Sequence, residues 1–319
     1  MKLHPCIPVL VLSVNPVFAQ GVRDSVVQFT SGPITLEGTL TIPPGPGPFP
    51  GAVIIAGSGP TDRDGNSPAG IGTDAYAMLA KGLAERGIAS LRYDKRGLPS
   101  SKGTVVMATT TLDHFADDAT AAAGLLAART DIGPVVFIGH SEGGTLAMLA
   151  AADSAPVQGL VLVATAGRRP TAILREQLGR QFPPAVVASF DTAWAGYLRG
   201  DTAVTPPPAL AGLFAPETRR FLQSWEAIDP VEMLARLRLP TMVLQGETDV
   251  QITLDDARRL ARARPDVRLV TLPGVNHVLK EASGATPQAQ AAAYTNRALP
   301  LAPAVVPAIA DFIKSIPQR

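Results

Sequence analysis

Metal-ligating and disulfide-forming side chains are scarce in this sequence. Its 319 residues include a single cysteine and four histidines, which argues against a metal centre built on cysteine and histidine and against a disulfide framework. An excess of one charge is also missing, because 28 basic residues stand against 27 acidic ones. A protein that binds nucleic acid through its phosphates normally needs a basic block, so we expect no nucleic-acid partner.

Long apolar runs are missing too. The N-terminal run from Ile7 to Val14 is far too short to cross a bilayer, so we expect no stable membrane insertion. Lys2 precedes this run and Val17-Phe18-Ala19 follows it, which is typical of a secretory signal peptide cut near Ala19. Residues 1–19 are therefore expected to be removed as the protein is exported to the periplasm or the medium. The alternative is a buried or disordered N-terminal segment.

Strand and helix patterns alternate along most of the remaining chain. Hydrophobic residues make up 46% of the full sequence, which is enough for a sizeable core. Strands are expected at 25–29, 34–42, 52–56, 88–93, 135–138, 160–164, 241–245 and 267–271. Helices are expected at 75–86, 112–129, 145–152, 254–264 and 304–316. This alternation predicts an α/β fold with a mostly parallel central sheet flanked by helices.

One segment interrupts the alternation. Residues 165–238 contain no buried-strand pattern but several helical ones, so they are expected to form a helical cap between strands 6 and 7. The core is then divided into residues 20–164 and 239–319. Seven of the 16 aromatic residues lie within 165–235, including Trp194 and Trp225. They either pack the cap internally or line a pocket for an acyl chain.

The segment Gly139-His140-Ser141-Glu142-Gly143 is the first chemical signal. A Gly-x-Ser-x-Gly pattern is weak alone, but here an expected strand precedes it and an expected helix follows it. That context is typical of a nucleophile elbow, in which a tight turn raises the serine hydroxyl above the sheet. We therefore expect Ser141 to be a nucleophile. The alternative is a serine that caps the helix in an ordinary turn.

A serine nucleophile needs a general base, and elimination selects His277. His140 adjoins Ser141 on the turn, so its side chain is expected to point away from the hydroxyl, and His114 precedes the nucleophile at the start of a helix. His277 follows the last expected strand, in a loop that can reach Ser141. The orienting carboxylate is expected to be Asp249, with Glu247 as the alternative. The order serine, acid, histidine is that of α/β-hydrolases.

A serine that attacks a carbonyl group also needs an oxyanion hole, made of two backbone N–H groups that bind the tetrahedral intermediate. The residue after the nucleophile, Glu142, is expected to supply one of them. Its carboxylate would be unfavourable beside a developing negative charge unless it is neutralised. The second N–H is expected from Ser58, in the glycine-rich loop after the third strand.

Two other patterns point away from metals and cofactors. The segment Asp62–Asn66 superficially resembles a calcium loop, but its sixth and twelfth positions are Ser67 and Thr73 instead of glycine and glutamate. Gly57-Ser58-Gly59 lacks the third glycine of a dinucleotide-binding fingerprint. We therefore expect neither a metal nor a cofactor, and we expect the Asp and Arg side chains of this loop to tie it in place.

Gly57–Asn66, Arg92–Gly97 and Gly139–Gly144 follow one another along the chain. Together these three segments resemble a bacterial α/β-hydrolase family, similar to EstD-type serine carboxylesterases and to serine-aminopeptidase-like hydrolases. The resemblance covers nearly all of residues 20–319 and implies a helical cap. After Arg96-Gly97 the family usually has a glycine near the fourth position, whereas this chain continues with Leu98-Pro99-Ser100-Ser101, in a loop that would border the site.

The expected function is that of a secreted serine carboxylesterase that acts on small-molecule, short-chain acyl esters. One alternative is an aminopeptidase, amidase or thioesterase with the same triad. A peptidase would need an acidic anchor for the substrate amine, for which Glu217 and Glu226 are candidates. Another is a non-catalytic binding protein on a hydrolase scaffold. The sequence leaves the natural substrate and the oligomeric state open.

Overall fold

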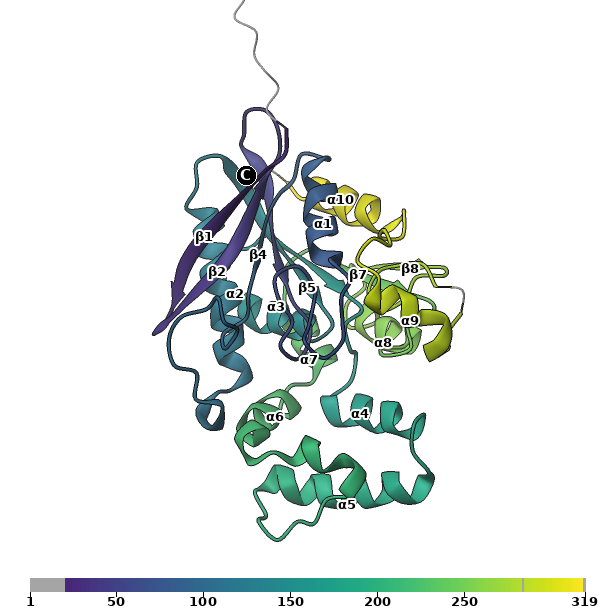
Figure 1. Ribbon diagram of the computed structural model, residues 1–319. Coiled ribbons are helices and arrows are strands. Elements are labelled where there is room, and N and C mark those ends of the chain that lie inside the picture. Colours follow the sequence, from purple (N-terminus) through teal and green to yellow (C-terminus); the bar gives the residue numbers. More distant parts are fainter. Residues whose placement is uncertain (1–20, 283, 318–319) are drawn as a thin grey trace, which may run out of the picture.

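The computed structural model describes residues 21–282 and 284–317, so the predicted signal peptide lies outside the described residues. An eight-stranded sheet runs through the centre of the molecule (Figure 1), in the order β1-β2-β4-β3-β5-β6-β7-β8. Only the β1–β2 and β2–β4 pairs of this sheet are antiparallel. The strands are β1 (Arg23–Ser31), β2 (Ile34–Ile42), β3 (Phe49–Ile55), β4 (Ala89–Tyr93), β5 (Ile132–His140), β6 (Gly159–Val163), β7 (Thr241–Gly246) and β8 (Arg268–Leu272).

Helices cover both faces of the sheet, as predicted. Side chains of β3 alternate between two apolar clusters: Ala52 and Ile54 belong to one, and Val53 and Ile55 to the other. Both clusters are buried, as expected for parallel strands covered on each side. The first cluster includes residues of α1 (Ala75–Ala84) and α10 (Val305–Ser315), and the second includes residues of α2 (Leu112–Ala127), α3 (Glu142–Ala152) and α8 (Leu254–Ala261).

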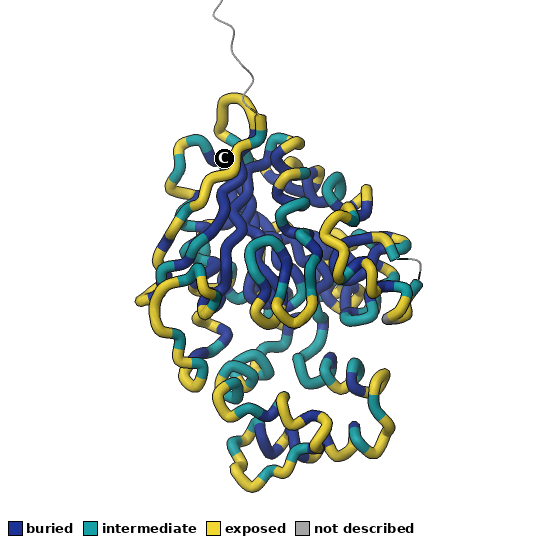
Figure 2. The backbone as a smooth tube through the Cα atoms, viewed as in Figure 1, coloured by how far each residue is buried: buried dark blue, intermediate teal, exposed yellow. Residues whose placement is uncertain are grey.

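The chain between β6 and β7 is helical. Trp194 is 3% exposed and packs with Phe190, Tyr197 and Phe214 in a separate apolar cluster. Figure 1 places α4, α5 and α6 together at one end of the molecule, and Figure 2 shows buried positions inside this group. The helices are α4 (Pro170–Gly179), α5 (Pro184–Arg199), α6 (Arg219–Glu226) and α7 (Pro230–Arg236), with 3-10 turns at Pro208–Phe214 and Pro216–Thr218.

Several element boundaries differ from the predicted ones. β3 begins at Phe49, before the predicted start at residue 52, and its pairing with β5 shifts register between Phe49 and Gly51. Pro50 lies at that irregularity, where a residue without an N–H group is tolerated. α3 begins at Glu142 rather than at residue 145, because the helix starts directly after the elbow.

A helix and a 3-10 turn were not predicted. The helix α9 (Pro287–Thr295) has only Gln290 and Ala293 buried among its described side chains, so no apolar stripe marks it in the sequence. The start of α9 does have a sequence signal, because threonine followed by proline is typical of a helix N-terminus. In the structure the Thr286 side chain accepts the Ala289 N–H. The 3-10 turn spans Met107–Thr109. Within the described residues, no helix has the length and apolarity needed to cross a membrane.

Candidate active site

Ser141 lies in the turn between β5 and α3. Its φ and ψ are 55° and −119°, a conformation that residues other than glycine rarely adopt. The turn also needs glycine on either side: a Cβ on Gly139 would lie 2.3 Å from the Gly143 carbonyl oxygen, and one on Gly143 would lie 2.3 Å from that of Ile55. This strained strand–turn–helix geometry is that of a nucleophile elbow.

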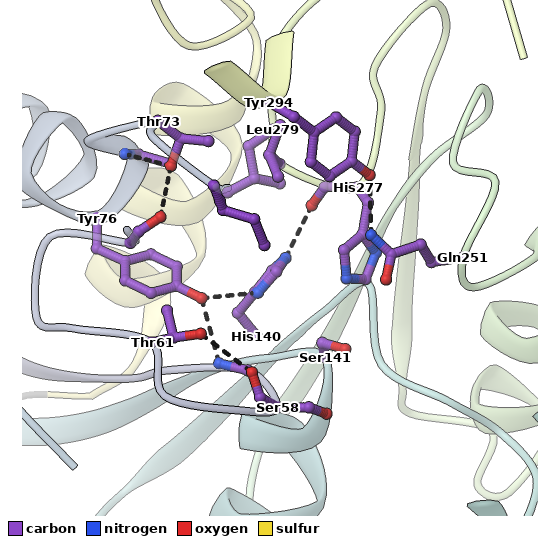
Figure 3. A pocket seen from close by; sticks show the side chains of 15 residues that line it. Ser58, Thr61, Thr73, Tyr76, His140, Ser141, Gln251, His277, Leu279 and Tyr294 are labelled. Atoms are coloured by element: carbon purple, nitrogen blue, oxygen red, sulfur yellow. Dashed lines mark hydrogen bonds between the residues drawn. The ribbon is translucent and has the colours of Figure 1, made fainter. Parts of the chain in front are cut away.

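A cavity of about 100 Å³ adjoins Ser141. It is lined by Ser141, by His277 from the loop after β8, by Ser58 from the loop after β3 and by Tyr294 of α9. Figure 3 shows the His277 ring on the side of the cavity toward which the Ser141 hydroxyl points. Three of the residues predicted for the site thus border one small space.

Asp249 and His277 form a buried pair. His277 Nδ1 lies 2.8 Å from Asp249 Oδ2, and the two side chains are 6% and 0% exposed. The other carboxylate oxygen accepts the N–H groups of Gln251 and Ile252. Burial raises the pKa of Asp249, but His277 and these backbone donors outweigh that effect, so its pKa lies below the ordinary value. The alternative carboxylate, Glu247, is exposed.

His140 is occupied by other partners. Its Nδ1 lies 2.8 Å from the Tyr76 hydroxyl and its Nε2 lies 2.8 Å from the His277 carbonyl oxygen. A carbonyl only accepts, so Nε2 carries the proton and Nδ1 accepts from Tyr76. Burial and the neighbouring His277 lower the pKa of His140 to about 3, which keeps the ring neutral.

Tyr76 extends this network to the predicted oxyanion loop. Its hydroxyl oxygen accepts the Gly57 N–H at 3.2 Å (Figure 3). The chain of hydrogen bonds Gly57–Tyr76–His140–His277 therefore joins the loop after β3 to the loop that carries the predicted base. The sequence analysis did not identify Tyr76. This residue lies in α1, and the spacing of residues in that helix does not indicate that its hydroxyl reaches Gly57 and His140.

Both residues predicted for the oxyanion hole adjoin Ser141, one in sequence and one in the cavity. Glu142 follows it directly, and Ser58 lines the same cavity as Ser141. Gly57 passes close to the nucleophile, since a Cβ on it would lie 3.2 Å from Ser141 Cβ. The Glu142 carboxylate is paired with Lys95 Nζ at 2.9 Å, so its charge is neutralised.

The polar loop after β3 is held by ion pairs. Arg63 donates to Asp94 Oδ2 from two nitrogens, at 2.9 and 2.6 Å, and also pairs with Glu37. Asp62 accepts the N–H groups of Asp64 and Asn66 instead of facing a ligand. Burial raises the pKa of Asp94, but Arg63 outweighs this and the net pKa is lowered. Among the described residues, no cluster of three or more potential metal ligands occurs.

A second, larger cavity borders the loop after β3. It measures about 450 Å³ and is bordered by Gly59 of that loop and by Glu142. Its lining includes the apolar side chains of Met107, Phe115 of α2 and Phe221 of α6, and the charged side chains of Lys95 and Arg96. Neither tryptophan lines this cavity or the one beside Ser141. Trp194 instead donates its indole N–H to Thr171 within the helical segment.

The chain is similar to known proteins in sequence and in fold. Residues 71–281 match a family model described as serine aminopeptidase, S33. Esterase EstD of Thermotoga maritima is 29% identical over 253 residues, which cover 78% of this chain and 59% of that protein. The chain thus spans less than two thirds of the length of this relative.

Solved structures of low sequence identity share the fold. An esterase of Pyrococcus furiosus superposes with a TM-score of 0.59 at 14% identity, covering 96% of each chain. Proline iminopeptidase of Mycobacterium smegmatis gives 0.58 at 18% identity, covering 91% of this chain and 98% of that one. Est1E of Butyrivibrio proteoclasticus gives 0.55 at 16% identity, covering 91% and 96%. The architecture is that of the α/β-hydrolases.

Proposed function

The chain belongs to the serine aminopeptidase S33 family of α/β-hydrolases, and from that premise we propose that it is a serine carboxylesterase acting on short-chain acyl esters. The observation that carries the proposal is the buried Asp249–His277 pair, which lies 2.8 Å apart beside the cavity that holds Ser141. A serine on a strained elbow, an imidazole in the same cavity and a carboxylate behind the imidazole are the parts that acyl transfer requires.

The first half of the reaction acylates Ser141. Its Oγ attacks the ester carbonyl carbon while His277 Nε2 takes the hydroxyl proton, and Asp249 stabilises the resulting imidazolium. The carbonyl oxygen becomes an oxyanion that accepts the N–H groups of Ser58 and Glu142. When the tetrahedral intermediate collapses, the C–O bond breaks and His277 returns the proton to the departing alcohol.

The second half hydrolyses the acyl-enzyme. Water attacks the carbonyl carbon, His277 takes its proton and then passes it to Ser141 Oγ as the acid is released. Because His277 protonates the alcohol, the alcohol occupies the small cavity that His277 lines. The acyl chain then extends past Glu142 into the larger cavity lined by Phe115 and Phe221, which is apolar enough for a short hydrocarbon chain.

Cleavage of aminoacyl amides has weaker support. An aminopeptidase needs a free carboxylate on the acyl side to hold the substrate ammonium group. In the larger cavity Glu142 is already paired with Lys95, and none of the described residues lining the Ser141 cavity is Asp or Glu. Of the predicted anchors, Glu226 accepts hydrogen bonds from the N–H and hydroxyl of Thr171. Glu217 is exposed and borders neither of the two cavities.

The helical segment is proposed to cap the site, and the chain to be exported. Phe221 of α6 lines the larger cavity, and Ser224 of the same helix accepts the Leu112 N–H at 2.8 Å, which ties α6 to the core.

A signal peptide ending near Ala19 is tested by expressing the full chain in a bacterial host. The mass of the exported protein then gives its first residue, expected to be Gln20.

A single substrate panel tests the enzymatic proposal. Nitrophenyl esters and thioesters of increasing acyl length are assayed beside aminoacyl amides, with wild-type protein and Ser141→Ala. We expect the highest kcat/KM on esters of about four to eight acyl carbons, by the pocket argument above. A fluorophosphonate should label wild-type protein at Ser141 and leave Ser141→Ala unlabelled. Turnover retained by Ser141→Ala contradicts the mechanism, and binding without turnover in the wild type indicates a non-catalytic protein.

A further inference from the structure

A buried ammonium group lies behind the proposed oxyanion hole. Lys95 follows β4, and its side chain is 8% exposed. Its Nζ donates to the Gly57 carbonyl oxygen at 2.5 Å and to Glu142 Oε1 at 2.9 Å. The Phe115 ring lies 5.7 Å from the same nitrogen. One cation therefore touches both segments that are proposed to supply the oxyanion donors.

Burying such a pair is costly. Removing an ammonium and a carboxylate from water costs several kcal/mol for each ion, and their attraction often does no more than offset this cost. Apolar side chains would fill the same space without that cost. The arrangement therefore calls for a role that only a charged donor can fill at this position.

The geometry of one peptide unit supplies that role. The Gly57 carbonyl and the Ser58 N–H belong to the same planar peptide group, in which C=O and N–H point in opposite directions when the bond is trans. Lys95 holds the oxygen end of this group. Gly57 also lies against the nucleophile, since a Cβ on it would be 3.2 Å from Ser141 Cβ. Fixing the oxygen on Lys95 therefore fixes the direction of the Ser58 N–H.

The charge of Lys95 also favours the Ser58 N–H as an oxyanion donor. A cation on the carbonyl oxygen polarises the peptide group and strengthens its N–H as a donor, because linked hydrogen bonds reinforce one another. The Glu142 carboxylate balances the ammonium, while its backbone N–H is the second proposed donor. The side chain that neutralises Glu142 thus also orients Ser58.

We propose that Lys95 is a positioning residue for the oxyanion hole, which it orders through the Gly57–Ser58 peptide and the Glu142 side chain. The inference rests on the proposed function. It implies that Lys95 stabilises the transition state more than the bound ester. Loss of this effect lowers kcat and kcat/KM together and leaves KM nearly unchanged.

The test removes the ammonium without leaving a buried charge. In Lys95→Met/Glu142→Gln we expect kcat on a short nitrophenyl ester to fall about 10- to 100-fold, less than the 10²- to 10³-fold typical of losing a whole donor. An aryl boronic acid, which forms an anionic tetrahedral adduct on the serine, should bind weaker by a similar factor. On an acetate ester, whose acyl group is too short to fill the larger cavity that Lys95 and Glu142 also line, KM should stay within about twofold of the wild-type value, as expected for an interaction made only in the transition state.

Arg264→Met is the matched control for stability. Arg264 is also a buried cation, and it donates to the carbonyls of Leu237 and Leu239, away from both cavities. Its loss should lower Tm but leave kcat per folded molecule unchanged, with the folded fraction measured by circular dichroism. If the first double variant does not fold, Lys95→Gln/Glu142→Gln, which retains two hydrogen-bonding side chains, is judged by the same three measurements.

The outcomes separate this inference from the function it rests on. A folded double variant with wild-type kcat and wild-type boronate affinity overturns the role of Lys95, and so does a raised KM at constant kcat. Turnover that survives Ser141→Ala instead overturns the proposed function. Ester turnover that depends on Ser141 and is insensitive to Lys95 refutes the positioning role alone.

Discussion

Replacing Asp249 by asparagine tests the proposed machinery at a single atom. Asp249 Oδ1 accepts two backbone N–H groups, from Gln251 at 2.7 Å and from Ile252 at 3.0 Å, while Oδ2 accepts His277 Nδ1–H at 2.8 Å. An amide has one acceptor oxygen, and the two backbone donors hold it at the Oδ1 position. The amide nitrogen of Asp249→Asn then faces His277 and donates to Nδ1. The imidazole proton moves to Nε2, which can no longer take a proton from Ser141.

The loss of kcat caused by the wrong His277 tautomer can be estimated from a serine protease. The equivalent change in a serine-protease triad lowers kcat about 10⁴-fold, or about 5 kcal/mol of transition-state stabilisation. Because Asp249 does not line the Ser141 cavity, KM should change little. The new NH₂ group also faces the Gln245 side-chain nitrogen, 3.1 Å away in the wild type. The Gln245 nitrogen also donates to the Gly246 and Ile252 carbonyls, so the amide cannot rotate without losing both bonds, and Asp249→Asn should also lower Tm.

The assay compares kcat and Tm of wild type, Asp249→Asn and Glu247→Gln on one nitrophenyl ester. Glu247 is exposed, so its variant should match the wild type in both measurements. A kcat for Asp249→Asn within tenfold of wild type, together with loss of activity in Glu247→Gln, would assign the orienting acid to Glu247 and refute the reasoning above.

Three further predictions concern the neighbours of the triad. The pKa of His140 is about 3 in the folded protein against 6.5 for a free imidazole. The unfolded chain therefore binds more protons between these values, and Tm should fall as the pH drops from about 6.5 toward 4, less steeply in His140→Gln. Tyr76→Phe, which removes the hydroxyl between His140 and the predicted oxyanion loop, should lower kcat about tenfold, somewhat less than loss of an oxyanion donor. It should also lower Tm, because the buried Gly57 N–H and His140 Nδ1 lose their partner. Phe221→Ala should move the preferred acyl length, since each buried CH₂ contributes about 0.8 kcal/mol, whereas Trp194→Ala should lower Tm only. An unchanged chain-length profile in Phe221→Ala would remove α6 from the acyl pocket.

The fold was predictable because its core elements have simple patterns. Strands β3, β5, β6 and β7 are buried on both faces, and such strands are continuous apolar runs in the sequence. The predicted boundaries and elements are wrong where tertiary contacts override the local sequence pattern. Phe49 enters the sheet because its N–H finds the Asp131 carbonyl, a partner 82 positions away that no local pattern indicates. Hydrogen bonds of Gln290 and Tyr294 hold α9 in place. Because these contacts are polar, the sequence of the helix shows no helical spacing of apolar residues.

The site divides in the same way. Ser141, His277 and Asp249 were predicted from their order in the chain and from their positions after strands, because the carboxyl ends of parallel strands meet at one edge of the sheet. Tyr76 and Lys95 were not assigned such roles, because their partners depend on side chains that meet across loops. A hint of Lys95 was the carboxylate of Glu142, since a charge beside a developing oxyanion requires a neutralising partner.

The three segments that carry the family resemblance are joined to each other in space. Arg63 of the first pairs with Asp94 of the second, and Lys95 of the second binds both Gly57 of the first and Glu142 of the third. Their shared residues therefore form the scaffold of the proposed nucleophile and oxyanion hole, which any acyl substrate needs in the same form. Leu98, where this chain departs from the family pattern, lines the larger cavity together with residues of all three segments. Substrate choice should consequently follow that loop and α6, and exchanging them between relatives should change acyl preference while Ser141 remains reactive toward fluorophosphonate.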